Sequence, residues 1–134
     1  MSKQDRHAAK LLKAAAQASN AAYAPYSGYL VGAAIEAEDG TIYSGCNLEN
    51  ASYGLTMCAE RSAIAQAIAA GRRRFTQVAI VASGPAMPFP CGACRQVLAE
   101  FCGPETLIYV ARAGELENDK QTTLGELFPH GFKL

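Results

Sequence analysis

Hydrophobic and polar positions follow two different periods along the chain, and the changes between them delimit helices and strands. Residues 5–23 carry alanine and leucine at intervals of three and four, which predicts an amphipathic helix. Pro25 should end this helix, because the residue before a proline avoids helical backbone. Residues 30–37 and 41–44 then indicate two short strands, joined by a hairpin turn at Asp39-Gly40.

The second half of the chain alternates helix and strand. The pattern predicts an α/β fold, with a partly parallel sheet and helices on its faces. About ten residues separate the last predicted strand from the last helix, too few for a helical crossover, so any fifth strand there should pair antiparallel. The expected elements are a helix at 59–70, a strand at 77–82, a helix at 92–102, a strand at 106–112 and a short helix opening at 123–126.

Composition narrows the class of protein. The chain has 134 residues with no internal repeat or low-complexity linker, so we expect one domain spanning residues 1–134. Its formal net charge is zero, which gives no general electrostatic reason to bind nucleic acid or an anionic membrane. No apolar run approaches the roughly 20 residues of a membrane span. We expect neither nucleic acid nor membrane as a partner.

Five cysteines are an odd number, which does not suit a disulfide framework and indicates reduced thiols in the cytoplasm. Cys58 opens one predicted helix, and Cys91 and Cys94 open another, so two helix N-termini favour their thiolates. Zinc suits soft thiolate ligands, and three protein ligands with one open position define a catalytic zinc site. Cys46 and Cys102 are then expected to be ordinary buried thiols.

Two residues beside Cys58 refine this hypothesis. Glu60 lies on the first turn of the same helix, where it can reach a zinc-bound water and move its proton without ligating the metal. Three thiolates and one Zn²⁺ sum to a charge of −1, so the site needs positive charge nearby. Arg61 follows Cys58 by three positions on the same helical face and is the best candidate to balance that charge, with Arg95 as a weaker second. We expect His7, on the polar face of the first helix, to be solvated.

These residues resemble the small homotetrameric cytidine deaminases over nearly the whole chain. The resemblance implies a three-layer α/β/α fold, in which a mixed five-stranded sheet carries helices on both faces. It also implies one zinc ion per subunit and a homotetramer whose active sites are completed by neighbouring subunits. The matching segments are APYS at 24–27, VGAA at 31–34, GCNLENASYGL at 45–55, CAER at 58–61 and PCGACRQ at 90–96.

The activity that the resemblance implies is hydrolytic deamination of cytidine and 2′-deoxycytidine to the uridines plus ammonia, in pyrimidine salvage. A zinc-bound hydroxide would attack C4 of the base, and Glu60 would move protons to N3 and to the leaving ammonia. Cys58, Cys91 and Cys94 would be the zinc ligands.

The resemblance also assigns the substrate contacts. Asn47 and Glu49 would bind the ribose hydroxyls, the backbone around Ala59 would read the base, and Phe132 would cover the base in a neighbouring subunit. Tyr29 stands where such enzymes usually have phenylalanine and would stack on the base or pack near the sugar, in a more polar pocket. Asn47 and Glu49 are also suited to bracing their own loop, and Phe132 to core packing.

Other functions fit parts of the pattern. A deaminase for another cytosine-containing molecule, of the blasticidin S type, shares the zinc motifs, but the Asn47-Leu48-Glu49 segment favours an ordinary nucleoside. A Cys91-Gly-Ala-Cys94 redox pair leaves Cys58 and Glu60 without a role. A non-catalytic zinc module is disfavoured by the neutral charge and by the presence of Glu60.

Overall fold

The computed structural model describes residues 2–134. The first helix, α1, spans Lys3–Ser19, and Ser2 and Asp5 form a reciprocal capping box at its start. It ends four residues before the predicted boundary at Tyr23. The backbone of Tyr23 instead pairs with the segment after the second strand: its N–H donates to the carbonyl of Asn47, and its carbonyl accepts from the N–H of Glu49. Tertiary pairing therefore ends the helical segment well before Pro25.

Five strands form one mixed sheet, in the order β2-β1-β3-β4-β5. β1 pairs antiparallel with both β2 and β3, β3 and β4 are parallel, and β5 is antiparallel to β4 as the short connection predicted. The parallel portion is confined to this one pair, β3 and β4. The strands are β1 Val31–Ala37, β2 Ile42–Cys46, β3 Phe75–Ala82, β4 Leu107–Arg112 and β5 Lys120–Thr123.

Three further helices follow the predicted pattern closely: α2 spans Ala59–Ala69, α3 spans Gly92–Phe101 and α4 spans Leu124–Leu127. Gly71 closes α2 with a φ of 91°, a conformation that glycine adopts without strain. Short 3₁₀ turns lie at Tyr53–Leu55 and Leu116–Asn118. None of the helices within residues 2–134 combines the length and the hydropathy of a membrane-spanning segment.

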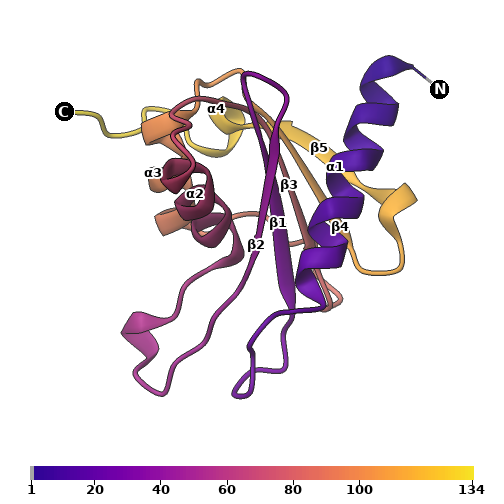
Figure 1. The fold of residues 1–134 in the computed structure, drawn as a ribbon, viewed down its shortest axis with the longest axis vertical. Helices are drawn as coiled ribbons and strands as arrows, with labels where there is room; N and C mark the ends of the chain where they lie inside the picture. The colour runs from indigo at the N-terminus through magenta and orange to yellow at the C-terminus, as the bar shows by residue number, and fades with distance from the viewer. Residues whose placement is uncertain (1) are drawn as a thin grey trace.

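The sheet lies between two helical layers (Figure 1). Helix α1 packs Leu11, Leu12 and Ala15 against one face, and α2 and α3 cover the other, where Ile64 and Leu98 join the main core. Both faces of the central strands are buried, which explains their nearly continuous apolar sequence. The three-layer α/β/α fold with a mixed five-stranded sheet is therefore confirmed.

One polar cluster interrupts the α1 layer. Glu36 is buried on β1 and interacts with His7 of α1, and it also accepts hydrogen bonds from Thr76 and Gln77 at 3.2 Å each. The expectation that His7 is simply solvated is wrong, because its ring reaches back to this buried carboxylate. The cluster ties α1 to the sheet and satisfies a charge that would otherwise be costly to bury.

The strand register brings several chain segments to one edge of the sheet. Val31, which begins β1, is paired with Ala82, which ends β3, and Gly32 is paired with Cys46, which ends β2. Loops 47–57 and 83–91 leave this edge and lead directly into the N-termini of α2 and α3. The two predicted cysteine motifs are thus carried to the same edge, where open α/β sheets commonly place their ligand sites.

Candidate active site

The thiols of Cys58, Cys91 and Cys94 form a compact cluster, with their sulfur atoms all within 4.8 Å of one another. Cys58 is the N-cap of α2 and Cys91 the N-cap of α3, while Cys94 lies one turn into α3 with none of its surface exposed. Neither N-cap thiol is used to cap its own helix. The residues predicted to be metal ligands therefore come together at two converging helix N-termini.

This donor set fits zinc. Zinc–sulfur bonds of about 2.3 Å in a tetrahedral site place two sulfur atoms about 3.8 Å apart, which the present spacing accommodates. Three ligands leave a fourth position for water or substrate. Cys46 and Cys102 lie outside the cluster; the first is half-buried and the second is buried. Cys58, Cys91 and Cys94 are thus the residues that would hold the ion.

Arg61 supplies positive charge to the thiol cluster. Its Nη2 donates to Sγ of Cys58 at 3.2 Å, and its Nε is buried without a hydrogen-bond partner among residues 2–134. A hydrogen bond from the Cys94 thiol, together with Arg61, lowers the pKa of Cys58 to about 5. The same hydrogen bond to Cys58 and burial raise the pKa of Cys94. Without metal, the cluster thus favours a thiolate at Cys58 and a protonated thiol at Cys94. Zinc binding would release the proton of Cys94, because the ligand of the metal is the thiolate.

Arg61→Ala should therefore loosen the metal. Without the guanidinium, three thiolates and one Zn²⁺ keep an uncompensated negative charge, and we expect zinc affinity and turnover to fall about tenfold. Arg61→Lys keeps the charge without the guanidinium's hydrogen-bonding geometry. Its zinc affinity should lie between those of wild type and Arg61→Ala. Zinc retention against a competing chelator is the measurement. Equal retention by wild type and Arg61→Ala would refute the charge-balance argument.

Glu60 is buried beside the cluster, with only 6% of its surface exposed. Burial, and the nearby negative charge of Cys58, raise the pKa of its carboxyl to about 7. A carboxyl group with a pKa near the working pH can both accept and donate a proton, which is what general acid–base catalysis needs. Glu60 lies two residues after Cys58, on the first turn of α2.

The raised pKa of Glu60 has a measurable effect on stability. In zinc-free protein the folded state keeps a proton on Glu60 that the unfolded state loses above its ordinary pKa of 4.5. This contribution to stability therefore falls as the pH rises from about 4.5 to about 7, by a total on the order of 3 kcal/mol. Glu60→Gln removes this pH dependence, so the variant should gain much more stability over wild type at about pH 8 than at about pH 5.

Urea unfolding with chelator and reductant present measures this difference. Comparing the two proteins at each pH cancels the contributions of the remaining titrating groups. An equal difference at both pH values would show that Glu60 titrates as an ordinary glutamate.

A cavity of about 200 Å³ opens onto the cluster. Cys58, Ala59, Glu60 and Cys91 are among its lining residues. Ala59 is the first residue of α2, and the first N–H groups of a helix have no partner within the helix. Its apolar and aromatic lining residues include Tyr29, Val31, Ile80, Pro88 and Phe89. The cavity thus combines apolar and aromatic lining residues with a few polar groups, as expected for a small-molecule site.

Asn47 and Glu49 lie on the loop after β2, and both brace backbone. Asn47 lines the cavity, and its side chain accepts from the N–H of Val31 at 3.0 Å and donates to the carbonyl of Tyr29 at 2.8 Å. Glu49 accepts from the N–H groups of Tyr26 and Ser27 at 2.9 and 3.1 Å and from the Ser27 hydroxyl, which lowers the pKa of Glu49.

The Glu49 carboxylate faces a separate hollow of about 350 Å³ rather than the cavity itself. Thr56 lines both, so the hollow adjoins the cavity. The structure thus places Asn47 in the site and Glu49 beside it.

Phe132 and Arg95 lie away from the thiol cluster. Phe132 is 65% exposed and does not line the cavity of its own chain, and its carbonyl accepts from the Gln96 side chain at 3.1 Å. Arg95 donates to the carbonyls of Pro90 and Leu127 at 2.8 and 2.6 Å. Arg95 therefore braces the loop before Cys91 against α4, and Arg61 alone of the two predicted arginines reaches the thiols.

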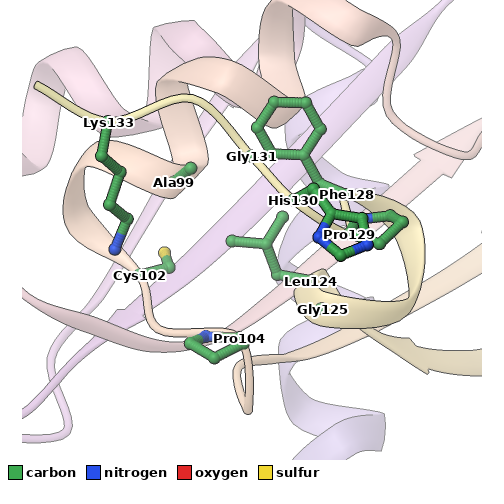
Figure 2. A pocket seen from close by; sticks show the side chains of 10 residues that line it. All are labelled: Ala99, Cys102, Pro104, Leu124, Gly125, Phe128, Pro129, His130, Gly131 and Lys133. Atoms are coloured by element: carbon green, nitrogen blue, oxygen red, sulfur yellow. The ribbon is translucent and has the colours of Figure 1, made fainter.

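A second cavity, of about 340 Å³, lies between the end of α3, α4 and the C-terminal tail (Figure 2). Cys102, His130 and Lys133 lie among its lining residues, together with Leu124 and Phe128. Within residues 2–134 it contains no grouping of three metal-ligating side chains. We therefore do not take this second cavity as the zinc-dependent active site, although its volume exceeds that of the cavity beside the three thiols.

Sequence reasoning missed the aromatic wall of the site. Phe89 and Pro88 line the cavity immediately before the ligand Cys91, and Thr56 and Met57 line it before Cys58. The sequence feature that could have indicated this part of the cavity is the Pro88-Phe89-Pro90 segment. A phenylalanine held between two prolines ahead of a metal ligand has little conformational freedom.

Comparison with known proteins places the fold and site in a family. Residues 5–111 match the family described as the cytidine and deoxycytidylate deaminase zinc-binding region. A cytidine deaminase of Sporosarcina psychrophila is 47% identical over 124 residues, covering 92% of this chain and 89% of the relative. One of Halalkalibacterium halodurans is 48% identical over 123 residues, covering 91% of each.

Solved structures agree with the sequence comparison. The crystal structure of cytidine deaminase from Burkholderia pseudomallei matches with a TM-score of 0.87 at 41% identity, covering 98% of this chain and all of that one. That of Mycobacterium tuberculosis matches with a TM-score of 0.80 at 36% identity over the full length of both.

The family match, the relatives and the three-thiol cluster together show a zinc-dependent deaminase. The chain belongs to the family of zinc-binding cytidine and deoxycytidylate deaminases. Zinc is accordingly its cofactor, and Cys58, Cys91 and Cys94 form the cluster able to hold it.

Proposed function

We propose that this enzyme hydrolyses cytidine and 2′-deoxycytidine to uridine and 2′-deoxyuridine, with release of ammonia. The observation that carries the proposal is the buried Glu60 beside the three-thiol cluster, where Glu60, Cys58 and Cys91 line a cavity that also has apolar and aromatic lining residues. Relatives named cytidine deaminases at 47% and 48% identity support the same substrate. The proposal takes residues 1–134 as one catalytic domain.

In the proposed reaction a water oxygen bonds to C4 of the base, the C4–N4 bond breaks and ammonia leaves. Bound zinc would supply a Lewis acid that makes water nucleophilic near neutral pH. Glu60 takes a proton from that water, gives it to N3 and assists the transfer of protons to the departing amino group. Its pKa of about 7 suits both directions of transfer.

The remaining site residues are proposed to hold the nucleoside. The N–H of Ala59 meets the polar edge of the base, and Tyr29 and Phe89 pack against its faces. Asn47 retains one amide N–H and one lone pair for a ribose hydroxyl, and Glu49 retains free lone pairs beside it. The bracing role of both residues is compatible with sugar binding, because bracing fixes the atoms that the sugar would meet.

A panel of cytosine, cytidine, 2′-deoxycytidine, CMP and blasticidin S tests the substrate assignment through the ultraviolet change on deamination. We expect turnover of the two nucleosides and little of the other three compounds. Preferential turnover of blasticidin S would favour the antibiotic-type alternative.

We also propose that the enzyme is a homotetramer whose sites are completed by neighbouring subunits. Support comes from the number of large apolar side chains exposed on the loops that border the cavity, which a single chain rarely leaves uncovered. Phe132 is exposed outside its own cavity and therefore has room to cover the base in another subunit. The exposed side chains on these loops are Tyr23, Tyr26, Leu48, Tyr53, Leu55, Met57 and Phe89.

Mixing two defective variants tests this completion. Glu60→Gln lacks the proton carrier, and we expect Phe132→Ala to raise KM about tenfold by uncovering the base. Subunits co-assembled from both variants contain sites with an intact Glu60 and an intact neighbouring Phe132. At substrate concentrations far below KM, their turnover should exceed that of the unmixed variants several times over. No gain on co-assembly would contradict the proposal, and sedimentation velocity measures the size of the assembly.

The proposed place of action is the cytoplasm, in the salvage of pyrimidine nucleosides. A cluster of three reduced cysteines that must hold zinc suits a reducing compartment.

A further inference from the structure

The contact between Tyr29 and the loop after β3 carries an inference about substrate binding. Tyr29 lines the cavity, and one edge of its ring lies against Gly84. A Cβ atom added to Gly84 would lie 2.6 Å from Cε1 and 3.1 Å from Cδ1 of that ring. Real Cβ atoms do not approach so closely, so the ring occupies the space that any side chain at Gly84 would need.

The backbone on both sides of this contact is fixed. The N–H of Leu30 donates to the Ser83 hydroxyl at 2.9 Å, and the N–H of Ser83 donates to the Leu30 carbonyl at 2.9 Å. The Tyr29 carbonyl accepts from the Asn47 side chain at 2.8 Å, and its N–H donates to the Ser27 hydroxyl at 3.0 Å. Because these hydrogen bonds hold the backbone of residues 29, 30 and 83, we expect a side chain at Gly84 to displace the Tyr29 ring rather than the backbone.

We propose that Gly84 is a positioning residue for the nucleoside: its missing side chain leaves the space in which the Tyr29 ring lies against the base cavity. This inference rests on the proposed function, and it adds a residue that touches neither the metal ligands nor the substrate. The positive φ that often requires glycine is absent here, so the close approach of the ring is the reason for glycine at this position.

Gly84→Ala tests the proposal. We expect KM for cytidine to rise about tenfold, kcat to change less than about threefold, and zinc content to stay equal to wild type. In a Tyr29→Ala background the added methyl group meets no ring, so Gly84→Ala should have no further effect on KM. In a Tyr29→Phe background the ring remains, and the effect should persist. Gly103→Ala is the matched control, because there the atoms nearest to the added Cβ belong to the side-chain end of Glu105, and neither residue lines the cavity.

Unchanged KM in Gly84→Ala overturns the inference, and so does a rise in KM that persists in the Tyr29→Ala background. If Gly84→Ala does not fold, recovery of folding in the Tyr29→Ala, Gly84→Ala protein supports the inference, and continued failure overturns it. Wild-type protein that releases no ammonia from cytidine overturns the proposed function and this inference together. Active wild type with an unaffected Gly84→Ala variant overturns the inference alone.

Discussion

Glu60→Gln is expected to keep its zinc and its fold, and to turn over cytidine at least about a thousandfold more slowly than wild type. Glutamine has nearly the same shape as glutamate, so the buried side chain should still pack beside Cys58. It has no carboxylate to accept a proton from water or to return one to N3. Steady-state ammonia release, with zinc content measured on the same samples, gives the result.

Glu100→Gln is the matched control, because Glu100 is exposed on α3 and does not line the cavity. Its turnover should equal that of wild type. If Glu60→Gln turned over cytidine at the wild-type rate, Glu60 would not be the proton carrier. If it lost zinc as well as activity, the loss would reflect the metal cluster rather than proton transfer.

Cys94→Ala should abolish zinc binding at micromolar zinc and, with it, all measurable turnover. Cys94 is fully buried and belongs to the three-thiol cluster, so its removal leaves two ligands where a zinc site needs at least three. No water or side chain replaces a buried thiolate without loss of affinity, and we expect zinc to bind at least about a hundredfold more weakly. Zinc content after dialysis and ammonia release are the two readouts.

Cys102→Ala is the matched control for Cys94→Ala, because it removes a buried sulfur that is not a predicted zinc ligand. Cys102 is also buried, and it follows α3, the helix that carries Cys94, but it lies outside the thiol cluster. Its removal should lower stability by about 1 kcal/mol through lost packing and leave zinc content unchanged. A Cys94→Ala protein that still carried one zinc per chain would exclude Cys94 as a ligand.

The chemistry of the site could be predicted from the sequence because it is encoded locally. The spacing of Cys91 and Cys94 within one helical turn, and of Cys58 and Arg61 within another, fixes which side chains share a face. Helix N-caps are also recognisable from sequence. The structure adds that the two helix starts converge, which follows from the common edge at which β2 and β3 end.

Features that depend on strand register could not be predicted. The Tyr29 ring meets Gly84 only because β1 and β3 pair with Val31 opposite Ala82. The same holds for His7, whose Glu36 partner is set by how α1 crosses β1. The early end of α1 reflects pairing of Tyr23 with the Asn47 loop, a tertiary contact that overrides a favourable helical sequence.

The central claim is that the zinc-loaded chain hydrolyses cytidine, and its most direct test is one incubation of the wild-type enzyme in water enriched in the heavy oxygen isotope. Ammonia is counted, and the uridine formed is weighed by mass spectrometry. We expect one ammonia for each uridine and one heavy oxygen atom in each uridine, at the carbon that carried the amino group. Failure to release ammonia, or uridine without the heavy oxygen, would contradict the central claim.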